Sequence, residues 1–382
     1  MKNELLVEIK DLRLDFHTFD GISKVLNGVN LKIWRGDILG LVGETGCGKT
    51  MTALSIPRLI PCPPGEITSG QVLFEGEDVL QKTQEEIRLL RARKLGMIFQ
   101  DPTTSLNPVF SIGEQMIDII GSRRDTSKAS RLSLLGGLGS IVPEIRGLRQ
   151  AARERAIEML QRVGISDAPK RIDDYPHQFS GGMRQRVLIA MALSETPSLL
   201  IADEPTTALD VSIQAQILRL IEELVQELNL STLLITHNLG VVAKMCQRVA
   251  VMYAGVIVEC GSVIDIFKNP KHPYTLGLMR AIPTYGTKRG EIKGIPGSVP
   301  NFLDPPPGCR FHPRCEHATP RCAEEPPPAP MEIAPGPWSF GTLSSGQGTE
   351  GPSPWSCGTL SSGQSTEGPR TKGHEVNCFL YS

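Results

Sequence analysis

A glycine-rich loop is the first feature of the sequence with clear chemistry. Eight residues match the pattern G-x-x-x-x-G-K-[ST]: Gly43, Glu44, Thr45, Gly46, Cys47, Gly48, Lys49 and Thr50. Glycines let the backbone curl so that its N–H groups face a phosphate, and a following helix adds its positive end. Lys49 is then expected to reach the β- and γ-phosphates of ATP, and the Thr50 hydroxyl to ligate Mg²⁺. The apolar run before the loop and the sequence MTALSI after it supply the strand and the helix that this site needs.

Two acids supply the carboxylates that a nucleotide–metal site requires. The apolar run 199–202 ends in Asp203 and Glu204. We predict that Asp203 holds Mg²⁺, largely through water. Glu204 is expected beside the γ-phosphate, where it polarises the attacking water. Such a pair alone is also typical of a solvated turn, but the phosphate loop in the same chain favours the catalytic interpretation.

Cys47 lies inside the phosphate loop and has two interpretations. A thiolate is favoured at a helix N-terminus, which predicts a reactive thiol that ATP protects. The alternative is a small, inert filler of the loop.

The elements expected around these residues are those of a parallel sheet with helices. Strands are predicted within 7–42, where Val29, Leu31 and Ile33 alternate with polar residues. From residue 187 onward, strand-like runs alternate with helices. Residues 102–178 are predicted to form a mainly helical insertion, in which 121–150 is a basic, Gly/Ser-rich loop.

Composition excludes several classes of protein. Hydrophobic residues make up 40% and charged residues 21% of the chain, and the net charge is -1. We therefore expect no general attraction to nucleic acid. No apolar run is long enough to span a membrane, and the N-terminus lacks the apolar core of a secretory signal. These patterns predict a cytoplasmic protein that docks on partner subunits if it works at a membrane.

Three cysteines near the C-terminus form a separate cluster. Cys309, Cys315 and Cys322 follow the spacing C-x5-C-x6-C, which is not that of a zinc finger. Thiolates suit zinc or an iron–sulfur cluster. Three incidental free cysteines are the alternative.

A tandem repeat occupies residues 337–369. PWSFGTLSSGQGTEGP is followed by PWSCGTLSSGQSTEGP, and this Gly/Ser-rich composition predicts a flexible insertion. Cys357 of the second copy aligns with Phe340 of the first, so it is not expected to be a ligand. Cys378 has apolar neighbours that can anchor it, and we predict it as the fourth ligand of any metal site.

Four further motifs, with the phosphate loop and the acidic pair, resemble the ABC ATPase family in their order along the chain. Residues 179–185 (FSGGMRQ) resemble the ABC signature, with Met183 in the usual glutamine position. Gln100 resembles the Q-loop glutamine, and residues 207–210 (TALD) resemble the D-loop. His237, after an apolar run, resembles the switch histidine.

The resemblance implies how these residues act. Two ATPase domains pair head to tail, so that the signature of one touches the ATP bound by the other; the residues concerned are Ser180, Gly181, Gly182 and Met183. Gln100 would help to hold Mg²⁺ and couple to the helical insertion. His237 would hydrogen-bond the γ-phosphate, which makes Glu204, His237 and Gln100 the catalytic set. Phe19 is the preferred residue for stacking on adenine, with Phe16 and His17 as rivals.

The end of the chain resembles the C-terminal region of dipeptide/oligopeptide importer ATPases. The matching segments are 272–279 (HPYTLGLM), 295–300 (IPGSVP), 308–315 (GCRFHPRC) and 373–381 (GHEVNCFLY). In some members of this family, cysteines of this region bind an iron–sulfur cluster. The resemblance thus implies a [4Fe–4S] site formed by Cys309, Cys315, Cys322 and Cys378.

These observations predict an α/β fold. It consists of a P-loop ABC ATPase domain, with a RecA-like parallel core, an antiparallel β subdomain and the helical insertion, plus a small Pro/Gly/Cys-rich extension. The expected divisions are an ATPase domain at 1–260, an importer-type region with the cysteine cluster at 261–336, the repeat at 337–369 and a closing segment at 370–382.

The resemblance implies a subunit that hydrolyses ATP with Mg²⁺ to power peptide import from the cytoplasmic face of the membrane. Its partners would be a second ATPase subunit and two permease subunits, with an external solute-binding protein acting indirectly. The alternatives are import of sugars or metal complexes, a soluble ABC ATPase outside transport, and a regulatory module that binds ATP without hydrolysing it.

Overall fold

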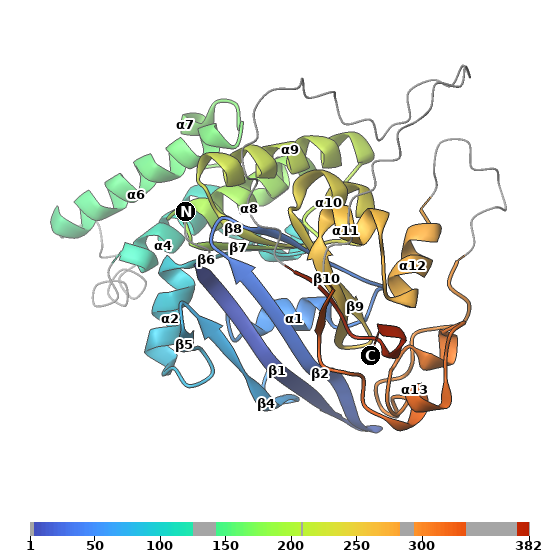
Figure 1. Cartoon of the computed structure of the whole chain (residues 1–382). Coiled ribbons are helices and arrows are strands. Elements are labelled where there is room, and N and C mark those ends of the chain that lie inside the picture. The colour runs from blue at the N-terminus through green and yellow to red at the C-terminus, as the bar shows by residue number, and fades with distance from the viewer. Residues whose placement is uncertain (1–3, 125–142, 208, 283–293, 334–372, 382) are drawn as a thin grey trace, which may run out of the picture.

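A computed structural model describes residues 4–124, 143–207, 209–282, 294–333 and 373–381. Two sheets organise these residues, one of four strands and one of eight. In Figure 1 the antiparallel sheet lies below the larger sheet, and most of the later helices lie above it. The described residues contain no helix with the length and apolar character needed to cross a bilayer.

The four-stranded sheet is antiparallel, with the order β2-β1-β4-β5. Successive side chains of its strands point alternately to the buried face and to the outer face, as expected for strands that bury one side. Val29, Leu31 and Ile33 are all buried, which confirms the predicted pattern. The strands are β1 (Leu5–Thr18), β2 (Gly21–Trp34), β4 (Gly65–Phe74) and β5 (Glu77–Asp78).

The eight-stranded sheet has the order β11-β12-β10-β9-β3-β8-β7-β6. Strands β9, β3, β8, β7 and β6 pair in parallel, whereas β10, β12 and β11 add antiparallel strands at one edge. The strands are β3 (Ile38–Val42), β6 (Leu95–Ile98), β7 (Leu199–Asp203), β8 (Ser231–Ile235), β9 (Arg248–Tyr253), β10 (Val256–Ser262), β11 (Met331–Ile333) and β12 (His374–Val376).

The central strands are buried on both faces and separate two hydrophobic cores. In β7, Leu200 and Ala202 pack with the helices, while Leu199 and Ile201 pack with the antiparallel sheet. A continuous apolar run is what a parallel strand covered on both sides requires.

Helices fill the expected insertion and cover the sheet. The predicted loop at 121–150 was too long, because helix α4 continues to Arg124 and helix α6 begins at Pro143; residues 125–142 lie outside the described part of the chain. The helices up to the last parallel strand are α1 (Lys49–Ser55), α2 (Gln84–Arg93), α3 (Pro102–Ser105), α4 (Ile112–Arg124), α6 (Pro143–Arg162), α7 (Ala168–Arg171), η1 (Pro176–Gln178), α8 (Gly181–Leu193), α9 (Val211–Glu227) and α10 (Leu239–Met245).

The C-terminal region folds back onto the ATPase core. Its helices are α11 (Val263–Lys268), α12 (Pro273–Arg280), η2 (His312–Arg314), α13 (Pro320–Glu324) and η3 (Phe379–Tyr381). Strands β11 and β12 pair antiparallel, with Ile333 opposite His374, so the segment 334–373 leaves and re-enters the fold at one place. The predicted repeat falls within this segment and lies outside the described residues.

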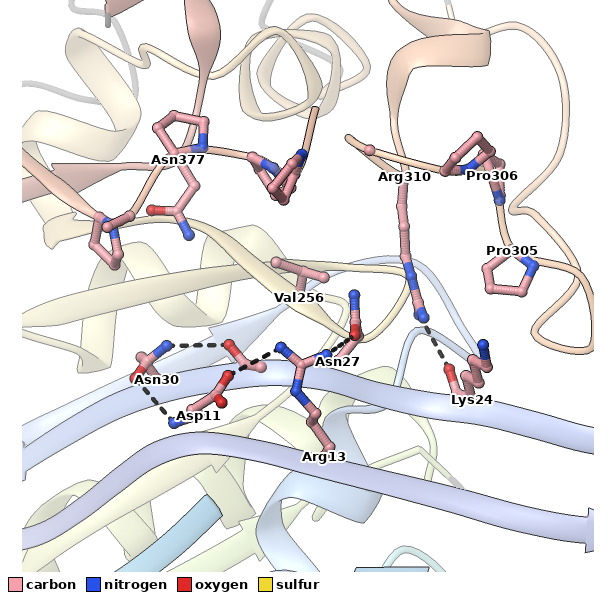
Figure 2. Close-up of a pocket in the computed structure, with 18 of the residues that line it drawn as sticks. Asp11, Arg13, Lys24, Asn27, Asn30, Val256, Pro305, Pro306, Arg310 and Asn377 are labelled. Carbon is pink, nitrogen blue, oxygen red and sulfur yellow. Dashed lines mark hydrogen bonds and ion pairs between the residues drawn. The ribbon is translucent and has the colours of Figure 1, made fainter. Parts of the chain in front are cut away.

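Two buried contacts fasten this region to the core. The His374 Nε2 lies 2.6 Å from an oxygen of Glu259, a fully buried carboxylate of β10. Figure 2 shows Arg310 reaching toward β2, where its Nη1 donates to the Lys24 carbonyl at 3.1 Å. The same nitrogen donates to the Ala254 carbonyl at 2.5 Å. Arg310 lines a pocket of about 640 Å³ between the antiparallel sheet and the proline-rich segments.

Candidate nucleotide site

The phosphate loop joins β3 to α1 with geometry that only glycine tolerates. Gly43 has a φ of 156°, and a Cβ atom there would lie 2.1 Å from the Met252 carbonyl oxygen. Gly48 caps α1 in the left-handed region at a φ of 104°. The Lys49 Nζ donates to the carbonyls of Gly43 at 3.0 Å and Glu44 at 2.9 Å. The loop is therefore curled around its own lysine.

Cys47 lies in the interior of this loop. Its side chain is fully buried. Burial raises the pKa of the Cys47 thiol above its ordinary value, although nearby Lys49 opposes the shift. Burial thus favours the inert filler over the reactive thiolate, because desolvation opposes the charged form of the thiol.

Asp203 lies at the end of β7 and faces the phosphate loop. Its carboxylate is almost fully buried. Burial raises the pKa of Asp203, while a hydrogen bond from the Thr50 side chain and the charge of Lys49 oppose this. The structure thereby brings together Thr50 and Asp203, two of the three residues predicted to hold Mg²⁺, at this end of the sheet.

Glu204 is the meeting point of three polar side chains. One of its carboxylate oxygens accepts from Gln100 Nε2 at 3.0 Å and from the Thr207 hydroxyl at 2.8 Å. The other lies 3.3 Å from His237 Nδ1. Gln100 follows β6 and His237 follows β8, so the strands on either side of β7 supply two of these partners.

These partners keep the Glu204 carboxylate ionised. Partial burial pushes its pKa upward, but the hydrogen bonds from Thr207 and His237 outweigh burial and lower the pKa below its ordinary value. The residue adopts a φ of 45°, an uncommon conformation for a side chain other than glycine. The backbone turn after β7 therefore aims the carboxylate at its partners.

The signature segment forms the start of α8. Ser180 is the N-cap, and its hydroxyl accepts from the Met183 N–H at 3.4 Å. Gly182 has no room for a side chain, because a Cβ would lie 2.7 Å from Ile213. The Met183 side chain packs against the helical core and contacts Arg171 Nη1 at 3.6 Å. Ser180 stays exposed at this helix end, where backbone N–H groups favour an anion.

The three aromatic candidates for adenine stacking differ in exposure. Phe19 is fully exposed in the turn between β1 and β2. Phe16 packs against the core beneath the antiparallel sheet. His17 lies 2.8 Å from a carboxylate oxygen of Glu66. Phe19 is thus the ring with an open face.

Four cysteines line one small, apolar cavity in the C-terminal region. They are Cys309, Cys315, Cys322 and Cys378. The Cys309 N–H donates to the Cys322 carbonyl at 2.8 Å, which holds the two loops together. Within the described residues, no three histidine, cysteine, aspartate or glutamate side chains converge closely enough for a single metal ion. Cys357 lies outside the described residues.

Comparison with known proteins places this architecture in a family. Residues 26–207 match the model of the ABC transporter family, and residues 258–322 match that of the oligopeptide/dipeptide transporter C-terminal region. The oligopeptide transport ATP-binding protein OppD of Bacillus subtilis is 45% identical over 85% of this chain and 85% of its own length. The chain belongs to this family of ABC transporter ATP-binding subunits.

Further relatives and solved structures agree with this membership. OppD of Salmonella typhimurium is 45% identical over 85% of this chain and 90% of its own length. The dipeptide transport protein DppD of Bacillus subtilis is 43% identical over 82% of this chain and 87% of its own length. The fold matches the ATP-binding cassette MJ0796, with a TM-score of 0.55 at 24% identity over 68% of this chain and 99% of that one. CbiO1 from Clostridium perfringens matches with a TM-score of 0.54 at 26% identity, over 70% of this chain and 92% of that one.

This ABC ATPase uses ATP and Mg²⁺. Some side chains that contact its nucleotide site could not be identified from the sequence motifs. Thr207 belongs to the D-loop pattern, yet its hydrogen bond to Glu204 is visible only in three dimensions. Ala208, in the same pattern, lies outside the described residues. Tyr274 and Arg314 of the C-terminal region also reach the phosphate loop. No local sequence signal could have linked them to it.

Proposed function

We propose that this ABC ATPase powers peptide import by hydrolysing ATP at sites shared between two ATPase subunits. The observation that carries the catalytic part is the Glu204 carboxylate, which Gln100, Thr207 and His237 hold beside the phosphate loop. The peptide solute is supported by relatives whose names are oligopeptide and dipeptide transport ATP-binding proteins.

The phosphate and metal roles follow from charge and position. Lys49 exchanges its carbonyl partners for the β- and γ-phosphates, supported by the backbone N–H groups of the loop. Thr50 and Asp203 hold Mg²⁺, with Gln100 completing the metal environment. Phe19 stacks on the adenine, because its ring is fully exposed.

Glu204 activates water for attack on the γ-phosphate. A carboxylate with a lowered pKa is charged at neutral pH and accepts a hydrogen bond from water. His237 donates to the γ-phosphate, and its contact with Glu204 fixes the relative position of both groups. Product phosphate leaves once the subunits separate.

The second subunit supplies the other wall of the site. Ser180, Gly181 and Gly182 begin α8 and offer an exposed hydroxyl and N–H groups to the γ-phosphate held by the partner. Met183 in the usual glutamine position contributes its N–H to the Ser180 cap, while its side chain packs inward. ATP thereby closes the dimer, and hydrolysis reopens it.

The region after Gln100 transmits this motion to two permease subunits. Phe99, Val109 and Phe110 lie near Gln100 in the sequence and expose 44%, 71% and 49% of their surface. Exposed large apolar side chains of this kind suit contact with a helical segment of a permease at the cytoplasmic face of the membrane. CbiO1, a structural relative, is described as part of an ABC transporter complex, in keeping with such an assembly.

A [4Fe–4S] cluster would be held by Cys309, Cys315, Cys322 and Cys378, because these four thiols line one cavity and thiolates are the ligands that such clusters take. In the described residues these side chains do not converge closely enough to hold a single metal ion such as zinc. A bound cluster would cross-link the loops that carry these cysteines.

The function is tested by reconstitution with two permease subunits and a solute-binding protein of the same source, identified by co-purification with this chain. In proteoliposomes we expect ATP hydrolysis to rise when the binding protein is loaded with a peptide, together with peptide uptake. A matched preparation receives sugars or metal complexes instead. Stimulation by those solutes and not by peptides would reject peptide import and leave the ATPase role intact.

A further inference from the structure

Glu44, the second residue of the phosphate loop, is held at three points. Its backbone N–H donates to the Tyr274 hydroxyl at 3.0 Å. Its carbonyl accepts from Lys49 Nζ at 2.9 Å. Its carboxylate oxygens lie 3.1 and 3.2 Å from Arg314 Nη1. Two of these three contacts come from the C-terminal region.

The Arg314 side chain is held in position by contacts other than the one with Glu44. It ends η2, between Cys309 and Cys315, and its side chain is only 7% exposed. Its Nε donates to the Pro296 carbonyl at 2.9 Å, and its Nη2 donates to the Ile295 carbonyl at 3.2 Å. A guanidinium fixed by such contacts loses little further entropy when it binds a carboxylate.

Tyr274 is equally fixed. It is fully buried in α12, and its ring packs at 4.6 Å from Tyr253 and 5.4 Å from Phe311, measured between centroids. Tyr253 also accepts from Arg314 Nη1 at 3.3 Å through its hydroxyl. The aromatic cluster and the arginine thus form one rigid support behind the loop.

We propose that Arg314 and Tyr274 are positioning residues of the nucleotide site, and that Arg314 raises ATP affinity by neutralising the Glu44 carboxylate. The proposal rests on the proposed role of residues 43–50 as the phosphate loop. ATP brings several negative charges to this loop, and a carboxylate within it opposes them. The importer-type C-terminal region is then a working part of the nucleotide site.

The charge argument predicts a specific rescue. Arg314→Gln leaves Glu44 unneutralised and should weaken ATP binding roughly tenfold, the order of magnitude for one uncompensated charge near the phosphates at an effective dielectric constant of about 20. The double variant Arg314→Gln/Glu44→Gln removes both charges and should return to within about twofold of wild type. Arg314→Lys keeps the charge and should lose less than Arg314→Gln.

The measurement is the affinity for a fluorescent ATP analogue, together with KM and kcat, on the full chain. We expect KM to rise and kcat to change little in Arg314→Gln. A double variant as weak as Arg314→Gln would overturn the proposal, since packing alone would then explain the loss. Wild-type affinity in Arg314→Gln would overturn it as well.

Two further variants keep the proposal testable if Arg314→Gln does not fold. Glu44→Gln alone leaves the arginine charge beside the loop and should bind ATP more tightly than wild type; affinity equal to or weaker than wild type would refute neutralisation. Tyr274→Phe removes only the hydroxyl that accepts from Glu44 and should weaken ATP binding several-fold, whereas unchanged affinity would remove Tyr274 from the proposal. Lys49→Ala tests the phosphate loop itself, because normal ATP binding in that variant would reject the loop assignment whatever Arg314 does.

Discussion

At the scale of single residues, the arrangement around Glu204 separates binding from chemistry. Lys49, Thr50 and Asp203 contact the loop and metal positions, whereas Glu204 accepts from Gln100, Thr207 and His237. A change confined to the Glu204 carboxylate therefore leaves the binding groups in place. This separation gives the first prediction.

Glu204→Gln should retain nucleotide affinity and lose at least about 100-fold in ATP turnover, the usual contribution of a general base. The amide keeps the shape of the side chain but cannot take a proton from water. Nucleotide affinity and phosphate release are measured with the permeases present. Glu204→Asp serves as a charge-retaining control, and wild-type hydrolysis in the glutamine variant would contradict the assigned role.

The thiols give a second prediction at this scale. Cys47 is buried and its pKa is raised, so it should resist alkylation at pH 7.5 with or without Mg-ATP. Cys62 is exposed and serves as an internal control that should react in both conditions. Mass spectrometry of the modified peptides provides the measurement. Labelling of Cys47 that ATP suppresses would restore the reactive thiol that the sequence suggested.

The Glu204 carboxyl gives a prediction about the pH dependence of ATP hydrolysis. Its pKa is lowered by the Thr207 hydroxyl among others, so Thr207→Val should raise that pKa toward its ordinary value. Because activity requires the ionised carboxylate, the rate should then fall at a higher pH than in wild type as the solution is acidified. ATPase rates measured as the pH is lowered from about 6 to about 3.5, through the ordinary range of a glutamate carboxyl, test this. An unmoved acid limb would argue against Glu204 as the base.

At the scale of elements, local sequence patterns were sufficient to predict secondary structure wherever the residues of one short segment determine it. The glycines and Lys49 predicted a strand, a loop and a helix, and the structure has β3 and α1 there. Alternating apolar residues likewise predicted the buried face of β2. Helix ends were less predictable. The Gly- and Ser-containing segments near residues 121 and 147 were predicted to lie in a loop, but they belong to helices α4 and α6.

Contacts between distant elements were beyond the sequence. Arg314 and Glu44 are separated by 270 residues, and nothing in either local pattern indicates a partner. The burial of Cys47 is also a tertiary effect that overrides the helix end. The sequence did single out Cys378, and the structure places it at the cavity that the other three cysteines line.

The cysteine-lined cavity gives the prediction that belongs to this scale. Cys378→Ser should lose iron and sulfide after anaerobic purification, whereas Cys357→Ser should keep both. The reason is that Cys378 follows β12, which is fixed in the sheet by its pairing with β10. Loss of metal from the Cys357 variant alone would refute the assignment, and a wild type without metal would remove the cluster.

At the scale of the whole molecule, the segment 334–373 connects two strands that pair with each other, β11 and β12. Strands β11 and β12 hold its two ends opposite each other, so its length does not constrain the sheet. Loop-closure entropy changes slowly with length. The tandem repeat should therefore be dispensable for the fold.

Deletion of residues 337–369 should preserve ATP hydrolysis and stabilise the protein slightly. Shortening this connection from about 40 to about 7 residues lowers the closure cost by about 1.5 kcal/mol. Calorimetry and steady-state ATPase assays compare the deletion with wild type. A matched replacement of the repeat by Gly/Ser sequence of equal length should leave both properties unchanged, and a marked loss of stability in either variant would contradict the argument.

The contact between Arg314 and Glu44 joins the phosphate loop to the region that carries the cysteine-lined cavity. Binding free energies coupled through one contact are coupled equally in both directions. The factor by which the docked region tightens ATP binding is then also the factor by which bound ATP tightens the docking. Each turnover would therefore alternately tighten and loosen the attachment of the C-terminal region to the phosphate loop.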